Sequence, residues 1–183
     1  MILRDFHTVK EDRLHWQQPK FGADHYQLLV GDHQLAEIYW TKMFSDQATA
    51  RTSRASWNFA RLGFFRSGIR AEDAATGIET ARIELNWWDS GEITCAGGRK
   101  FTWQKLGFWG DRWVFTAEGG GKLFDFWFGM HWFKRTGDVL LSPGAGEEPE
   151  LPLLICLGWY MATCDAQDAA GAVAAGGSVA AIL

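Results

Sequence analysis

The stretch LPLLICLGWYMATC, residues 151–164, decides what kind of fold this chain can adopt. No side chain between Leu153 and Ala162 carries a charge. At 3.6 residues per turn its apolar side chains cover every side of a helix, which must therefore be buried all round in protein or in lipid. Lipid requires about 20 consecutive apolar residues, and this run ends at Asp165. The sequence predicts no transmembrane span but a central helix over about 150–164, enclosed by protein, with these buried residues: Leu153, Leu154, Leu157, Gly158, Trp159 and Tyr160.

The residues just before this stretch are typical of a helix start. Glu147, Glu148 and Glu150 precede it, and Pro149 and Pro152 lie at its entry. Carboxylates near a helix N-terminus and prolines in the first turn both favour initiation at this point.

The rest of the chain indicates a mainly β protein. Eleven Trp and thirteen Phe favour strands, and 21 Gly favour tight turns. Turn signals recur along the chain at the spacing of a β-sandwich or barrel, which predicts about 10–12 strands. Alternation of apolar and polar residues, as in Trp113 and Phe115 against Arg112 and Thr116, predicts one buried and one wet face for each strand.

The strand boundaries follow from these turns. Residues 2–6 are predicted as a first strand, Gly31-Asp32 as the turn of a hairpin, residues 43–53 as a loop or a short helix, and residues 136–138 as a turn. Residues 122–128 are apolar on both faces except for Asp125, which predicts either a covered outer face or a slipped register. The later strands are expected over 57–62, 68–72, 78–88, 92–95, 99–106, 112–117, 122–128, 132–135 and 139–141.

The strands and the helix complement one another. An antiparallel sheet of this size must close its edges, and the resulting barrel is too wide to be filled by its own side chains. We therefore expect a closed antiparallel barrel that encloses the C-terminal helix, in a single domain over residues 1–164. Residues 165–183 are rich in Ala and Gly and are expected to form a flexible tail, or in part to pack on the barrel rim.

Charge and cysteine content restrict the partners and the compartment. A net charge of −4, with no densely basic window, argues against nucleic acid as a partner. Five arginines could form a local basic patch, although solvated strand faces and loops explain them more simply. Three cysteines without a CxxC motif fit a reducing compartment, and Asp5 interrupts any export signal, so the expected localisation is cytoplasmic. The arginines are Arg51, Arg54, Arg61, Arg66 and Arg70.

The order of these features resembles the tubby-like superfamily, which includes the tubby C-terminal domain, the phospholipid scramblases and the LURP-one-related proteins. The resemblance covers about Trp57 to Tyr160 and consists of a β-meander, an acidic linker with proline, and a Leu-rich run that ends in Leu157-Gly158-Trp159-Tyr160. It implies a closed barrel of about twelve strands around a hydrophobic helix. Functional residues do not carry over, because no basic headgroup cluster matches by position and residues 165–168 supply too few carboxylates for calcium.

Candidate site residues are few. Trp109 and Trp113 lie in or beside an aromatic turn that could stack on a ligand, and Arg66 and Arg70 could meet an anion. His25 and His33 could face one another across a hairpin as a surface metal site, and Cys95 could be a nucleophile, although ordinary structural roles explain these residues better. No catalytic residue, cofactor or metal is assigned.

Two main functional hypotheses remain. The first is a non-enzymatic binding or scaffold protein of tubby-like type, whose partner is a membrane lipid headgroup or a protein. The second is a lipocalin-like barrel that carries a small apolar ligand, and it requires an empty interior. An enzyme is the third and weakest alternative, because no catalytic constellation stands out.

Overall fold

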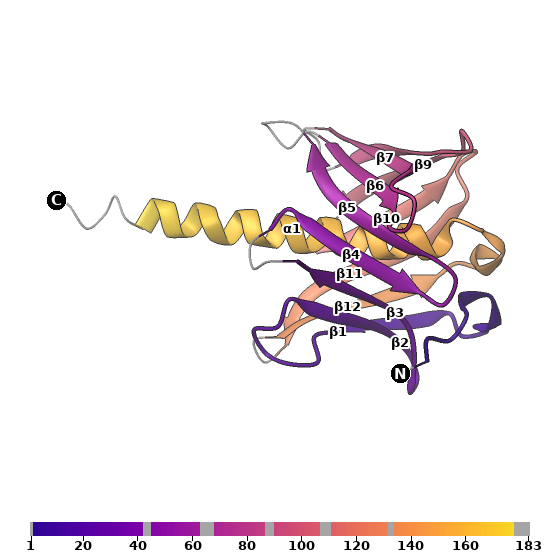
Figure 1. Ribbon diagram of the computed structural model, residues 1–183, viewed down its shortest axis with the longest axis horizontal. Helices are drawn as coiled ribbons and strands as arrows, with labels where there is room; N and C mark the ends of the chain where they lie inside the picture. Colours follow the sequence, from indigo (N-terminus) through magenta and orange to yellow (C-terminus); the bar gives the residue numbers. More distant parts are fainter. Residues whose placement is uncertain are drawn as a thin grey trace.

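The computed structural model describes residues 2–41, 45–62, 68–86, 90–106, 111–131 and 134–177. Within these ranges, twelve antiparallel strands form a closed barrel around one α-helix (Figure 1). Each strand pairs with its neighbours in sequence, and β1 pairs with β12 to close the barrel. The elements are η1 (Phe6–Thr8), β1 (Arg13–Gln17), β2 (His25–Val30), β3 (His33–Trp40), β4 (Gln47–Thr52), β5 (Ser56–Leu62), β6 (Gly68–Asp73), β7 (Glu79–Asn86), β8 (Ser90–Cys95), β9 (Lys100–Leu106), β10 (Arg112–Ala117), β11 (Lys122–His131), β12 (Lys134–Leu141), η2 (Ala145–Glu147) and α1 (Leu151–Gly177).

The helix begins where the sequence predicts but ends later. Its first intrahelical bond runs from the amide of Leu154 to the carbonyl of Glu150, at 2.9 Å. The chain stays helical past residue 164 to Gly177, so residues 165–177 continue the helix. The carboxylates that suggested an end are accommodated at the barrel rim, where Asp165 pairs with Lys105 at 2.8 Å and Asp168 pairs with Arg61 at 2.7 Å.

The two ends of the barrel differ because the helix runs through it in one direction (Figure 1). At the end that we call the start end, α1 follows η2, which contacts η1. Glu148 and Glu150, just before the helix, pair there with Arg99 of the β8–β9 turn. At the opposite end, the exit end, the ion pairs of Asp165 and Asp168 hold the helix near the ends of β9 and β5. The helix then continues beyond the strands.

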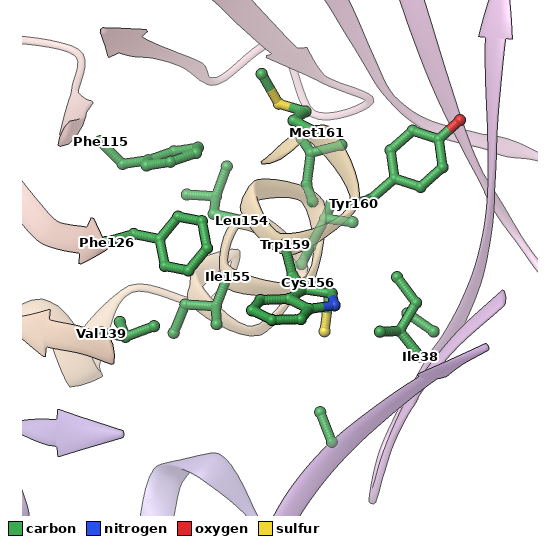
Figure 2. Packing of buried hydrophobic residues seen from close by; sticks show 14 of the residues in the cluster. Ile38, Phe115, Phe126, Val139, Leu154, Ile155, Cys156, Trp159, Tyr160 and Met161 are labelled. Carbon is green, nitrogen blue, oxygen red and sulfur yellow. The ribbon is translucent and has the colours of Figure 1, made fainter. Parts of the chain in front are cut away.

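Aromatic side chains join the helix to the wall of the barrel (Figure 2). Trp159 stacks on Trp16 of β1 with ring centroids 5.0 Å apart, and Tyr160 stacks on Trp40 of β3 at 5.9 Å. The Tyr160 hydroxyl donates a hydrogen bond to the carbonyl of Asp46 at 2.5 Å. All six residues predicted to face protein on the helix are buried, which confirms the enclosed helix.

Gly137 lies where the sequence predicted a turn, and that prediction is wrong. Residues 134–141 form one strand, β12, in which Gly137 pairs with Trp16 on one side and Phe128 on the other. A Cβ atom at Gly137 would lie 2.8 Å from a ring carbon of Trp159 and 2.8 Å from the carbonyl oxygen of Trp127. Its φ is outside the left-handed region. Glycine is therefore required by the close approach of the helix rather than by a turn.

Two other elements differ from the sequence prediction. Residues 2–6 do not form the first strand; Asp5 accepts a hydrogen bond from the amide of His7 and caps the short helix η1. Residues 43–53 contain strand β4 instead of a helix or a plain loop, although residues 42–44 lie outside the described residues. Ala48 and Ala50 of β4 face the interior, and their small side chains allow the wall to approach α1.

Strand β11 has a covered outer face, one of the two possibilities that its sequence left open. Phe124 is buried and stacks on Phe115 of β10, whereas Asp125 points to the other side and is only 2% exposed. Arg112 and Lys122 donate hydrogen bonds to the Asp125 carboxylate, each at 2.5 Å. Burial raises the pKa of Asp125, but the hydrogen bonds and charges of Lys122 and Arg112 outweigh this effect and lower it below its ordinary value.

Candidate functional site

The structure separates the residues that the sequence proposed for ligand contact. Arg66 and Trp109 lie outside the described residues. Trp113 is 4% exposed and stacks on Trp103 with ring centroids 5.1 Å apart. A ring buried in this way cannot stack on a ligand, so Trp113 does not belong to a binding site. Arg70 is the remaining candidate, on β6 at the outer wall of the barrel.

Arg70 lines a groove of about 270 Å³ on the outer face of β4, β5 and β6. The register aligns Ala60 of β5 directly between Gln47 of β4 and Arg70 of β6. The methyl group of Ala60 is much shorter than its two neighbours and leaves the wall hollow at this point. The remaining lining residues are Thr41, Ala48, Thr49, Asn58, Phe59 and Glu72.

The groove offers both hydrogen-bond donors and acceptors. Thr49 donates a hydrogen bond to the side-chain oxygen of Asn58 at 2.8 Å, which leaves the Asn58 amide group available as a donor. Thr41 and Gln47 flank the β3–β4 connection, so one end of the groove lies at the exit end of the barrel. The polar side chains along the groove suit a small hydrophilic ligand better than an apolar one.

The guanidinium of Arg70 is the cationic centre of the groove. Its Nε lies 3.0 Å from the Glu72 carboxylate, but the N–H is not aligned on that oxygen, and no hydrogen bond to a described residue engages the guanidinium. The side chain is 39% exposed. A guanidinium has five N–H donors arranged to bind oxyanions in pairs. Arg70 can therefore bind an anionic oxygen group while Glu72 remains beside it.

The other described arginines of the predicted basic patch, like Arg70, lie beside acidic residues. Arg51 lies 3.9 Å from Glu37, and Arg54 pairs with Asp5. Arg61 pairs with Asp46 and Asp168 at the exit end. The described arginines thus sit in separate ion pairs. Arg70 differs from Arg51, Arg54 and Arg61 in that it lines the groove.

The alternative metal and nucleophile sites are not assembled in the structure. His25 pairs with Tyr39 and His33 with Val30, so the two histidines lie at opposite ends of the β2–β3 hairpin. His25 instead lies 3.4 Å from Glu37. Cys95 is buried, and burial raises its pKa to about 11. Among the described residues, no group of three or more His, Cys, Asp or Glu side chains could hold a metal ion.

A second hollow, of about 420 Å³, lies at the start end between the N-terminal segment and the chain around Ser142. Lys10 and His7 line it together with the acidic residues Glu11, Asp12 and Glu147. Positive and negative side chains thus both line this open hollow, and it has no centre of a single charge. The groove at Arg70 is the better-defined site.

The alternation of β4 and β5 could have placed Thr49 and Asn58 on the wet face with Arg70. The hollow itself depends on which residue of β5 is opposite Arg70, and this register is not visible in the sequence. No protein-family model matches the chain, and no curated protein or solved structure matches it either. Across the residues that the structure describes, no helix combines the length and the hydropathy needed to cross a membrane.

Proposed function

We propose that this protein is a non-enzymatic binding protein that recognises a phosphate-bearing lipid headgroup through the groove at Arg70. The observation that carries the proposal is an outward guanidinium in a polar groove, without an aligned hydrogen bond to the described residues. Phosphate oxygens match the paired N–H donors of arginine, and such charge-assisted bonds are stronger than neutral ones. The resemblance to tubby-like proteins agrees with a binding role but does not supply these residues.

The neighbouring carboxylate restricts the kind of headgroup. Glu72 lies beside Arg70 and would repel a bare phosphate dianion, whereas it can accept hydrogen bonds from an ammonium or hydroxyl group. A headgroup that carries both a phosphate and an amine, such as that of phosphatidylethanolamine or phosphatidylserine, satisfies both side chains. We therefore expect glycerophosphoethanolamine to bind more tightly than inorganic phosphate.

The barrel interior favours this proposal over a carrier of apolar ligands. Trp159 and Tyr160 of α1 are fully buried against the strands, and Leu154 and Leu157 are as well. The helix thus occupies the space in which a lipocalin-like barrel would hold its ligand. Ligand recognition is therefore assigned to the outer wall.

The test measures binding of glycerophosphoethanolamine and of inorganic phosphate to the full chain. Calorimetry gives the affinity, and NMR chemical-shift changes of groove residues locate the site. Arg70→Gln should weaken binding of glycerophosphoethanolamine by about tenfold or more, the effect of losing a charge-assisted hydrogen bond. Arg82→Gln is the matched control. Arg82 of β7 lies directly opposite Arg70 in the strand register, but it is outside the groove and donates two hydrogen bonds to Glu79. Equal affinities of wild type and Arg70→Gln, or equal losses in both variants, would contradict the proposal.

A further inference from the structure

The exit end of the barrel exposes large hydrophobic side chains. Phe21, in the β1–β2 connection, is 71% exposed, and Met130, near the end of β11, is 69% exposed. The two segments are neighbours, because Lys134 of β12 donates a hydrogen bond to the carbonyl of Pro19 at 3.3 Å. Met130 of β11 pairs with Arg135, which lies in β12 next to Lys134. The two exposed side chains therefore belong to one face.

The apolar helix leaves the barrel through this same face (Figure 1). The last charged residues of α1, Asp165 and Asp168, are paired with Lys105 and Arg61 at the rim. From Ala169 to Gly177 the helix carries no charge, and residues 169–172 are exposed. At 1.5 Å per residue this part extends about 13 Å, close to the hydrocarbon depth of one leaflet, about 15 Å.

The charges of the two ends differ in a way that matches an anionic surface. Lys20, Lys134 and Arg135 lie next to Phe21 and Met130 at the exit end. Asp111, Asp165 and Asp168 are exposed at the exit end as well, but Asp165 and Asp168 are paired with Lys105 and Arg61. More exposed carboxylates lie at the start end, and the anionic leaflet of a membrane would repel them, so that the exit end faces the membrane. These carboxylates are Glu11, Asp12, Asp32, Glu118 and Glu147.

We infer that the exit end of the barrel docks on the surface of an anionic lipid bilayer, with Phe21 and Met130 in the interfacial region and the projecting helix extending into the adjacent leaflet. The inference rests on the proposed function, because the groove at Arg70 reaches the exit end at Thr41 and Gln47, where it would meet lipid headgroups. It adds the orientation and the hydrophobic contacts of the bound protein.

The test uses the full chain with a polarity-sensitive fluorophore at position 130 or 78. The three native cysteines are buried, so Met130→Cys and Ile78→Cys can be labelled selectively. Ile78 is the matched control, because it is 66% exposed in the β6–β7 turn at the start end. Vesicles of phosphatidylcholine with phosphatidylserine should shift the emission of the label at 130 to shorter wavelength and leave the label at 78 unchanged.

Flotation with the same vesicles supplies a second measurement. The double variant Phe21→Ser/Met130→Ser should bind at least about tenfold more weakly than wild type, since two apolar side chains no longer leave water. Ile78→Ser should bind like wild type. An unshifted label at 130, a shifted label at 78, or a shift at 130 that depends on protein concentration without vesicles would overturn the docking inference. The last result would indicate contact with a second copy of the chain, and none of these outcomes alters the headgroup test with soluble ligand.

Discussion

Gly137→Ala should destabilise the protein strongly although it adds a single methyl group. The new Cβ would lie 2.8 Å from three atoms at once: a ring carbon of Phe126, the carbonyl oxygen of Trp127 and a ring carbon of Trp159. Real Cβ contacts are essentially never this short. The backbone oxygen belongs to the adjacent strand β11, so relief requires β12 to move away from both β11 and the helix.

The magnitude follows from two opposing terms. Overpacking a well-packed core costs about 1–3 kcal/mol and occasionally more, and three simultaneous clashes place Gly137→Ala at the upper end of that range. The lower chain entropy of alanine in the unfolded state returns only about 0.4–1 kcal/mol. We expect a net loss of at least about 2 kcal/mol, which lowers Tm by roughly 4–8 °C in a chain of this size.

Urea unfolding followed by circular dichroism and by tryptophan fluorescence measures this loss. Gly129→Ala is the matched control, because Gly129 lies in the adjacent strand β11 and an added Cβ would meet no atom within 4 Å. It should leave stability unchanged or raise it slightly. If Gly137→Ala and Gly129→Ala unfold at the same urea concentration, the helix does not approach β12 as closely as described.

Three further predictions concern the core, the covered carboxylate and the cysteines. Leu157→Asp should prevent folding, because it places an unpaired charge in the enclosed part of α1; circular dichroism measures this, with the exposed Ile78→Asp as control, and wild-type melting of Leu157→Asp would show that the helix is not enclosed. Asp125→Asn should cost about 1–3 kcal/mol at neutral pH, since Arg112 and Lys122 lose a charged partner. Folding lowers the pKa of Asp125, so the stabilisation by its carboxylate is complete above the unfolded pKa near 3.9 and is lost as the pH falls through the lower folded value. Urea titrations at several pH values should therefore show the unfolding free energies of wild type and Asp125→Asn converging in acid. A difference in unfolding free energy that stays constant with pH would contradict the assignment. The three thiols should react slowly with a disulfide reagent at pH 8 and rapidly after unfolding, because all are buried and the pKa of Cys95 is raised to about 11; fast labelling of the folded protein would show that the barrel opens readily.

The sequence predicted the architecture because two signals were strong. A run of apolar residues without charge from Leu153 to Ala162 required enclosure, and recurrent turns with alternating strands supplied a barrel large enough to enclose it. The weak points were strands whose inner residues are few or small. Strand β1 has only Leu14 and Trp16 facing inward, and β4 has Ala48 and Ala50, because the wall must come close to the helix there.

The candidate site was less predictable than the fold. Trp113 shares the alternation of Phe115, so the pattern already placed its ring on the buried face, yet its closeness to an aromatic turn suggested exposure. Arg70 was identified as a cation, but the groove around it arises because the short side chain of Ala60 lies directly opposite it on the neighbouring strand β5. Register of this kind depends on the whole set of strand pairs and has no local sequence signal.

The order of elements along the chain determines when this protein can fold during synthesis. Strand β1 finds its second partner only in β12, and Arg13 pairs with Leu140 near the end of the strand series. The helix that fills the interior follows later still, so a ribosome-bound chain that has emerged only as far as β12 holds inward aromatic side chains with nothing to cover them. Long-range pairings of this kind form slowly and leave unpaired strand edges open to aggregation. The growing chain should therefore depend on chaperones until the helix has emerged, and the barrel and its contents must be completed together.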